Sequence, residues 1–300
     1  MARSENLTGA LLMMASMAAF TLNDAMMKAM AGEVPLNQLL FLRGLLTSIA
    51  VGIMAWRMRA LAVRLPGRDR WLVVLRMVAE TGAAYFFLTA LFNMPLANVT
   101  AILQALPLTI SLGAALVFRE PIGWRRLTAI LIGFIGVMLI VRPGAEGFNI
   151  YSLYALTAVA FVTLRDLTTR KLSPEVPSIF VTFTTTLTVM AFFGLASLTD
   201  DWVAMDMRQM MLTLGASAMI IGGYLFSIMV MRVGEISFIA PFRYTGLIWA
   251  LALGWLVFGD WPDTVTLLGA GVVVASGIFT LYREAQTGLR KRAAPALRQR

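Results

Sequence analysis

Long apolar stretches alternate with short polar turns along the whole chain. A helix needs about 20 apolar residues to cross the hydrocarbon of a bilayer, and each stretch has roughly that length. The turns carry Gly, Pro or charge, as at Pro66-Gly67 and Trp261-Pro262-Asp263, which are residues that interrupt helices. The pattern predicts ten helices, with bounds good to about 2–4 residues, over 7–29, 36–56, 71–92, 97–118, 125–141, 150–168, 177–198, 210–230, 235–258 and 263–282.

The alternative structure that satisfies its backbone within lipid is a closed β-barrel, whose strands alternate apolar and polar residues. Segments such as Leu127–Val141 are apolar without alternation, so we predict an all-α membrane protein. The first stretch follows a single basic residue, Arg3, and has no small-residue cleavage site. We therefore expect a membrane helix there and not a cleavable signal peptide.

Composition supports a membrane protein. The chain is 59% hydrophobic and 14% charged, whereas soluble domains carry about 25% charged residues. One core cannot bury so much apolar surface, so lipid must cover the rest. Cysteine and histidine are both absent, which excludes disulfides, thiol catalysis and metal sites built on these two residue types.

Basic residues separate onto one set of turns. With ten spans, the turns on one side hold most of the Lys and Arg, while the other side holds only Lys28, Arg142 and Arg208. Because basic residues accumulate in cytoplasmic loops, both termini are predicted to be cytoplasmic and the membrane to be the cell inner membrane. The net charge of +9 then reflects topology and contact with membrane lipid, and we expect no nucleic-acid partner.

Two halves of the sequence resemble each other. The segment Thr21–Asp24 recurs about 140 positions later as Thr163–Asp166, and Glu33–Pro35 recurs in the same register as Glu175–Pro177. Leu116–Phe118 recurs at a nearly equal offset as Leu256–Phe258. The matches predict two related units of five helices, over 1–142 and 143–283, followed by a basic cytoplasmic tail over 284–300.

An odd number of helices per unit places the second unit upside down in the membrane. The chain is therefore predicted to form two inverted five-helix repeats. This architecture recurs in secondary transporters, which hold substrate near the membrane midplane between the repeats. No Gly-x-x-x-x-Gly-Lys-Ser/Thr segment is present, so direct use of ATP is not expected.

Several segments resemble the drug/metabolite transporter superfamily with two EamA-type domains, over essentially the whole chain. These marks are Asn23-Asp24 with Lys28, Phe41-Leu42-Arg43-Gly44, Leu75-Arg76, Phe118-Arg119-Glu120, Gly133 with Gly136-Val137, and Ala240-Pro241-Phe242-Arg243-Tyr244. The resemblance implies ten helices around a central cavity that opens alternately to each side. It implies no metal and no bound cofactor.

Within that superfamily the chain looks most like bacterial riboflavin importers and S-adenosylmethionine carriers. The Asn23-Asp24 pair and Pro241–Tyr244 carry this likeness. It implies uptake of riboflavin, with a planar heteroaromatic metabolite as the substrate class. Uptake or exchange of S-adenosylmethionine and export of amino acids or other metabolites on the same fold remain alternatives, because alternating access is reversible.

Charged residues inside the predicted spans need partners or a cavity, since a charge at the helix centre costs at least about 2.5–3.5 kcal/mol. Arg76 and Glu80 are four residues apart and can pair on one helix face, either as a structural pair or as a substrate contact. Asp24 and Lys28 have the same spacing near one membrane surface, so they are predicted to be gates or, preferably, anchors that reach the interface.

The remaining candidates for substrate binding or coupling lie on other spans. Arg43 and Arg243 have no carboxylate within one turn, and an arginine fork can hold a carboxylate, a phosphate or a ring carbonyl. Gln104 precedes Pro107, and Tyr244 follows Pro241, which predicts kinks in the fourth and ninth spans. The candidate residues are Asp24, Arg43, Arg76, Glu80, Gln104, Arg243, Tyr244 and Trp249.

A membrane enzyme acting on lipid is the remote alternative. Asp200-Asp201 could hold a metal, but the pair stands alone in a short polar loop, so we predict no enzyme activity. The surplus of apolar helix faces is explained either by contact with membrane lipid or by contact with a second copy in a homodimer.

Overall fold

The computed structural model describes residues 2–61, 63, 65–119, 122–143, 149–230, 233 and 236–297, and these residues form helices and connecting segments. The helices, in chain order, are α1 (Ala2–Lys28), α2 (Leu36–Arg57), α3 (Gly67–Asn93), α4 (Leu96–Leu103), α5 (Leu106–Phe118), α6 (Trp124–Val141), α7 (Tyr151–Lys171), α8 (Ser178–Ala196), η1 (Ser197–Thr199), α9 (Met207–Val230), α10 (Ile236–Ile239), η2 (Ala240–Tyr244), α11 (Thr245–Phe258) and α12 (Thr264–Leu297).

Nine helical segments in the described part of the chain are long and apolar enough to cross a membrane. They correspond to nine of the ten predicted spans. The predicted span at 150–168 forms the long helix α7, but α7 is not among the nine. It differs because its second half carries Arg165, Asp166, Arg170 and Lys171.

Proline breaks two of the spans, as the sequence predicts. The fourth span is divided at Gln104 and Ala105 into α4 and α5, with Pro107 in the first turn of α5. The ninth span passes from α10 through the 3₁₀ helix η2, whose first turn holds Pro241, into α11. Proline has no backbone N–H to donate and clashes with the preceding turn, so an uninterrupted α-helix cannot pass through either point.

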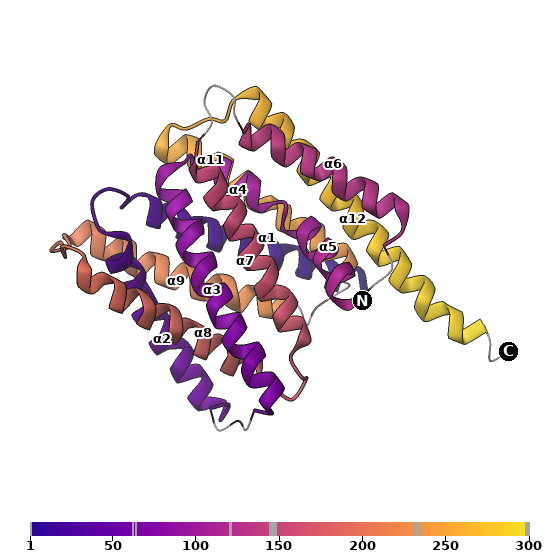
Figure 1. The fold of residues 1–300 in the computed structure, drawn as a ribbon, viewed down its shortest axis with the longest axis horizontal. Coiled ribbons are helices and arrows are strands. Elements are labelled where there is room, and N and C mark those ends of the chain that lie inside the picture. Colours follow the sequence, from indigo (N-terminus) through magenta and orange to yellow (C-terminus); the bar gives the residue numbers. More distant parts are fainter. Residues whose placement is uncertain are drawn as a thin grey trace.

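The long helices pack side by side in four extensive pairs, which are α1 with α9, α2 with α8, α3 with α7, and α6 with α12. Figure 1 shows α6 and α12 together on one flank of the bundle and α2 with α8 on the opposite flank. The helix α12 continues past the bundle toward the C-terminus (Figure 1). Buried apolar residues in the interior include Met27, Leu39, Leu88, Ile102 and Ile130.

Glycine permits the close approach of α6 and α12. A Cβ added to Gly136 would lie 2.8 Å from the carbonyl oxygen of Gly269, and one added to Gly269 would lie 2.7 Å from the carbonyl oxygen of Gly136. Gly133 likewise faces Leu108 and Ser276. Gly271, in contrast, has open space where its side chain would be.

The ends of this helix pair are joined by polar contacts. Arg142, directly after α6, donates to the carboxylate of Asp263. Asp263 also accepts from the backbone N–H of Thr266 at 2.9 Å in the first turn of α12. That backbone hydrogen bond, together with Arg142, holds the pKa of Asp263 below its usual value. The aspartate is therefore ionised at neutral pH, and its negative charge is favourable at the N-terminus of α12.

We expect Gly136→Ala to destabilise the protein by about 1–3 kcal/mol, since the added methyl meets a backbone oxygen that cannot move alone. The matched control is Gly271→Ala, on the same helix pair. There the methyl enters open space, and alanine favours a helix over glycine by up to about 1 kcal/mol. Thermal unfolding in detergent measures both variants. Equal melting temperatures for the two would contradict this account of the α6–α12 contact.

Candidate functional site

A pocket opens between the middle parts of four helices. Its walls come from α2, α3, α8 and α9, and it contains about 600 Å³ of space free of protein atoms, counting its mouth. The lining combines charged, hydroxyl and apolar groups. Its polar members are Arg43, Thr47, Arg76, Glu80, Thr182, Thr185, Thr186 and Tyr224.

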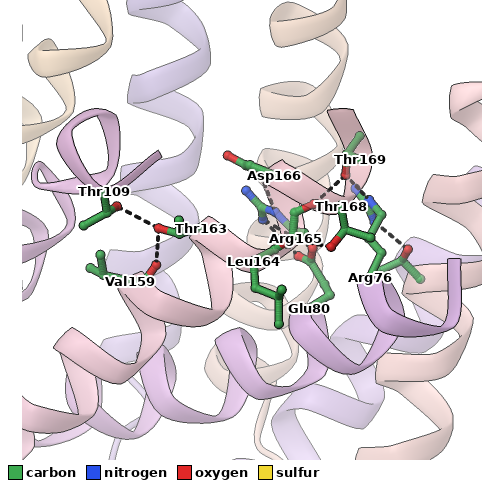
Figure 2. A network of polar contacts seen from close by, with 11 residues as sticks. Arg76, Glu80, Thr109, Val159, Thr163, Leu164, Arg165, Asp166, Thr168 and Thr169 are labelled. Carbon is green, nitrogen blue, oxygen red and sulfur yellow. Dashed lines mark hydrogen bonds and ion pairs between the residues drawn. The ribbon is translucent and has the colours of Figure 1, made fainter. Parts of the chain in front are cut away.

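Arg165 on α7 connects two carboxylates beside the pocket (Figure 2). Its Nη1 lies 3.3 Å from Oε2 of Glu80, and its Nε donates to Oδ1 of Asp166 at 2.8 Å. The Arg165 and Glu80 side chains are 24% and 18% exposed. Because two carboxylates share one guanidinium away from bulk water, removing the arginine would leave both without their counter-charge.

The predicted pair of Arg76 with Glu80 is not formed. Arg76 donates from Nε to Oγ1 of Thr169 on α7, at 2.7 Å, and from Nη1 to Oγ1 of Thr185 on α8, at 2.6 Å. Figure 2 shows Glu80 turned to Arg165 and Arg76 turned to Thr169. The spacing of four residues brought both side chains to one wall of the pocket, but partners on neighbouring helices hold each of them.

Arg43 is buried on α2 and reaches Asp24 through an asparagine. Its Nη1 donates to Oδ1 of Asn23 at 3.2 Å, and Nδ2 of Asn23 donates to Oδ1 of Asp24 at 2.9 Å. The structure places an amide between Arg43 and Asp24, so that Asn23 bonds to both. Arg43 lines the pocket, and Asp24 is linked to Arg43 through Asn23.

Lys28 is held by the carbonyl end of a neighbouring helix. Its Nζ donates to the carbonyl oxygens of Met94, at 2.6 Å, and Leu91, at 3.1 Å. A cation is favourable there because the last carbonyls of a helix lack partners. The sequence favoured an anchor that reaches the membrane interface, whereas in the structure Lys28 bonds to a helix end. In the second half, Arg170 lies over the ring of Phe118, 5.0 Å from its centroid.

Gln104 and Tyr244 meet where the two broken helices cross. Nε2 of Gln104 donates to the carbonyl oxygen of Tyr244 at 3.1 Å. These residues stand at the break in each helix, and neither lines the pocket. The Tyr244 hydroxyl is buried with no hydrogen-bond partner in the described structure. A side chain at Gly277 would overlap that hydroxyl, so glycine is required where α12 passes it.

Two other candidates lie away from the pocket. Arg243 is half-buried on η2 and makes no hydrogen bond or ion pair with the part of the chain that the structure describes. Trp249 is 38% exposed on α11. Of the predicted residues, the structure therefore brings Arg43, Arg76 and Glu80 into one pocket, with Asp24 adjacent.

Contacts between the two halves of the chain gather at one end of the bundle. Gln38, at the start of α2, donates to the carbonyl oxygen of Val203 at 2.8 Å and accepts from its N–H at 3.1 Å. Nearby, Arg208 at the start of α9 pairs with Glu33 at 2.9 Å, and Nε2 of Gln209 donates to the same carboxylate at 3.0 Å. These contacts join the segment before α2 to the segment before α9.

The sequence reasoning missed Tyr224 and the threonines of α8. Tyr224 lines the pocket from α9, and Phe20 meets its ring edge-on with centroids 5.4 Å apart. Thr182, Thr185 and Thr186 stand at positions i, i+3 and i+4. They share one helix face of a segment in which threonines recur among apolar residues, and this run of threonines is the signal that could have identified them.

This arrangement defines a multi-pass integral membrane protein whose apolar helices enclose a charged, hydroxyl-lined pocket. The model of the EamA-like transporter family matches residues 7–142 and again residues 149–282. The chain therefore belongs to the EamA-like transporter family, and it contains the family unit twice.

Curated relatives are transporters with different named substrates. The chain is 29% identical over 250 residues to a riboflavin transporter of Vibrio cholerae, covering 82% of this chain and 83% of that one. It is 26% identical over 199 residues to an S-adenosylmethionine uptake transporter of Rickettsia conorii, covering 66% and 67%. It is 23% identical over 277 residues to the pseudopaline exporter CntI of Pseudomonas aeruginosa, covering 90% and 95%.

A solved structure shares the fold. It is 22% identical to this chain and superposes with a TM-score of 0.63, covering 94% of this chain and 98% of that chain. At that identity the likeness establishes the arrangement of helices and leaves the substrate open.

Proposed function

We propose that this protein is a secondary transporter that moves a small organic metabolite across the inner membrane by alternating access. The observation that carries the proposal is the pocket at Arg43, Arg76 and Glu80, which lies near the midpoints of apolar helices. Charges at that depth are costly, so they are found where they face a partner or a cavity. Transport without chemistry suits this lining, and the named relatives are transporters.

We further propose ten membrane helices in two inverted units, 1–142 and 143–283, with α7 as the tenth helix, both termini cytoplasmic, and 284–300 as a basic tail. The helix pairs support this organisation. Exchanging the two units converts the pair α1 with α9 into the pair α7 with α3, and converts α2 with α8 and α6 with α12 into themselves. A two-fold relation between the units produces such a pattern.

The contacts at Glu33, Gln38 and Arg208 support a closed mouth at one end of the passage. By the positive-inside rule that end faces away from the cytoplasm. In this proposal the pocket is reached from the opposite end, and transport requires these contacts to separate. Because the two units are inverted copies, an equivalent set of contacts would then close the other end.

Riboflavin uptake is the specific function that we propose. The riboflavin transporter of Vibrio cholerae matches most of both chains. The pocket also offers guanidinium donors and the ring of Tyr224, which suit a planar ring with carbonyl groups. S-adenosylmethionine uptake and metabolite export are the alternatives, supported by the other relatives.

We expect expression of the chain to restore growth of a riboflavin auxotroph that lacks its own importer, on low riboflavin. Cells should accumulate labelled riboflavin at least tenfold faster than cells with the empty vector. The variant Arg43→Gln should lose most of this uptake, since its buried guanidinium contacts both the pocket and Asn23. Absence of rescue, with the protein confirmed in the membrane, would contradict riboflavin as the substrate.

A further inference from the structure

The threonines on the α8 wall of the pocket present acceptor oxygens. Oγ1 of Thr182 donates its proton to the carbonyl oxygen of Ser178 at 2.9 Å, and Oγ1 of Thr185 donates to Val181 at 2.6 Å. Oγ1 of Thr186 donates to Phe183 at 3.0 Å. A threonine hydroxyl has one proton and two lone pairs. Since each proton is used within α8 in this structure, these hydroxyls offer their lone pairs to hydrogen-bond donors in the pocket.

On α3, Arg76 provides donors to the same pocket. It is bonded to the hydroxyls of Thr169 and Thr185 through Nε and Nη1, and no carboxylate among the described residues forms an ion pair with it. A guanidinium has five N–H donors in a planar fork, so donors remain available. Glu80, the carboxylate on the same wall, is held by Arg165.

Donors and acceptors lie side by side in the pocket, joined by the hydrogen bond from Arg76 Nη1 to Thr185 Oγ1 at 2.6 Å. The remaining donors of Arg76 on α3 require acceptor oxygens, and the face of α8 that holds Thr182 and Thr186 requires hydrogen-bond donors. A ligand that satisfies both must carry the two kinds of group at neighbouring positions. A ligand with acceptors alone would leave the threonine oxygens without donors, at the cost of desolvating them.

We propose that the substrate places a pair of acceptor oxygens against Arg76 and a chain of hydroxyl or amine donors against Thr182 and Thr186. This inference rests on the proposed transport function and extends it to the class of substrate. Two ligand groups supply the acceptor pair, namely the two carbonyls of a flavin ring and a carboxylate. In a flavin the donor chain is the hydroxylated side chain of riboflavin.

Binding to the purified protein, followed by flavin fluorescence, tests the donor half. The probes are riboflavin and lumiflavin, which has the same ring and lacks the hydroxylated chain. We expect the wild-type protein to prefer riboflavin. The double variant Thr182→Val/Thr186→Val should weaken riboflavin binding about tenfold and leave lumiflavin binding unchanged. Arg76→Gln should weaken both ligands equally.

The matched control is Thr184→Val, on the same helix, whose hydroxyl also bonds to the α8 backbone, at 3.0 Å from the carbonyl oxygen of Val181. This residue does not line the pocket, so its substitution should change neither ligand. If the double variant alters riboflavin binding no more than Thr184→Val does, the assignment of the threonine wall is overturned while riboflavin transport stands.

A second ligand pair separates the two acceptor sources. If the wild-type protein binds neither flavin, the proposed substrate is wrong, and S-adenosylmethionine is compared with its methyl ester, which has no carboxylate. We then expect a preference of at least tenfold for the acid that Arg76→Gln abolishes and that Thr184→Val leaves intact. Equal binding of acid and ester, or no binding of either pair, would overturn the inference.

Discussion

Linking position 33 to position 208 should stop transport. Glu33, which precedes α2, and Arg208, in the first turn of α9, form an ion pair. The Nη1 atom of Arg208 lies 2.9 Å from Oε2 of Glu33. The chain contains no cysteine, so Glu33→Cys/Arg208→Cys introduces the only two thiols. A short bis-methanethiosulfonate reagent should join them in this conformation, and uptake should fall more than tenfold because the closed end can no longer open. A reducing agent should restore it.

The equivalent pair in the other half provides the control. Arg68 at the start of α3 and Glu175 before α8 correspond to Arg208 and Glu33 when the two halves are aligned. Both are exposed and make no ion pair with the described residues. In Arg68→Cys/Glu175→Cys we expect slow cross-linking that accelerates under conditions of active transport. If it cross-links as fast as the first pair and substrate has no effect, the two ends do not alternate.

Replacing Arg165 should destabilise the protein. Arg165→Met removes the counter-charge of both Glu80 and Asp166, which Figure 2 shows on either side of its guanidinium. Removing one partner of a poorly solvated ion pair costs about 3 kcal/mol, because the remaining charge loses its compensation. Melting temperature in detergent should fall by several degrees, and the yield of monodisperse protein should fall with it.

Two further variants separate the ion pair from a general effect of losing an arginine. Glu80→Gln/Arg165→Met should recover part of the lost stability, since the double variant no longer leaves Glu80 charged and unpaired. Arg142→Met breaks the exposed pair with Asp263, and exposed pairs contribute about 0–1 kcal/mol. A loss of stability in Arg142→Met equal to that in Arg165→Met would contradict the account.

The sequence predicted the helices well because their pattern is strong. Apolar stretches of membrane length, and the breaks at Pro107 and Pro241, depend on local chemistry that each segment carries in itself. The family resemblance was likewise confirmed, since the family model matches both halves. The helix α7 departs from the apolar pattern because its charges bond to neighbouring helices, as Arg165 does to Glu80.

Partners between helices could not be predicted in the same way. The spacing of Arg76 and Glu80 indicated a shared wall of the pocket, but which cation meets Glu80 depends on how α7 packs against α3. The sequence indicated Arg43 as a candidate for substrate binding, but it did not indicate that Asn23 would lie between Arg43 and Asp24. The threonines of α8 carry no charge, so the cost of charges within the membrane gave no indication of the wall that they form.

The hydrogen bond from Gln104 to the Tyr244 carbonyl has a consequence for how the protein moves. Each residue stands at the break of its own helix, one in each half of the chain. A bend at either break would displace a group that bonds to the other, so we expect the two breaks to move together. A substitution at either break should therefore change the conformation at both ends of the bundle.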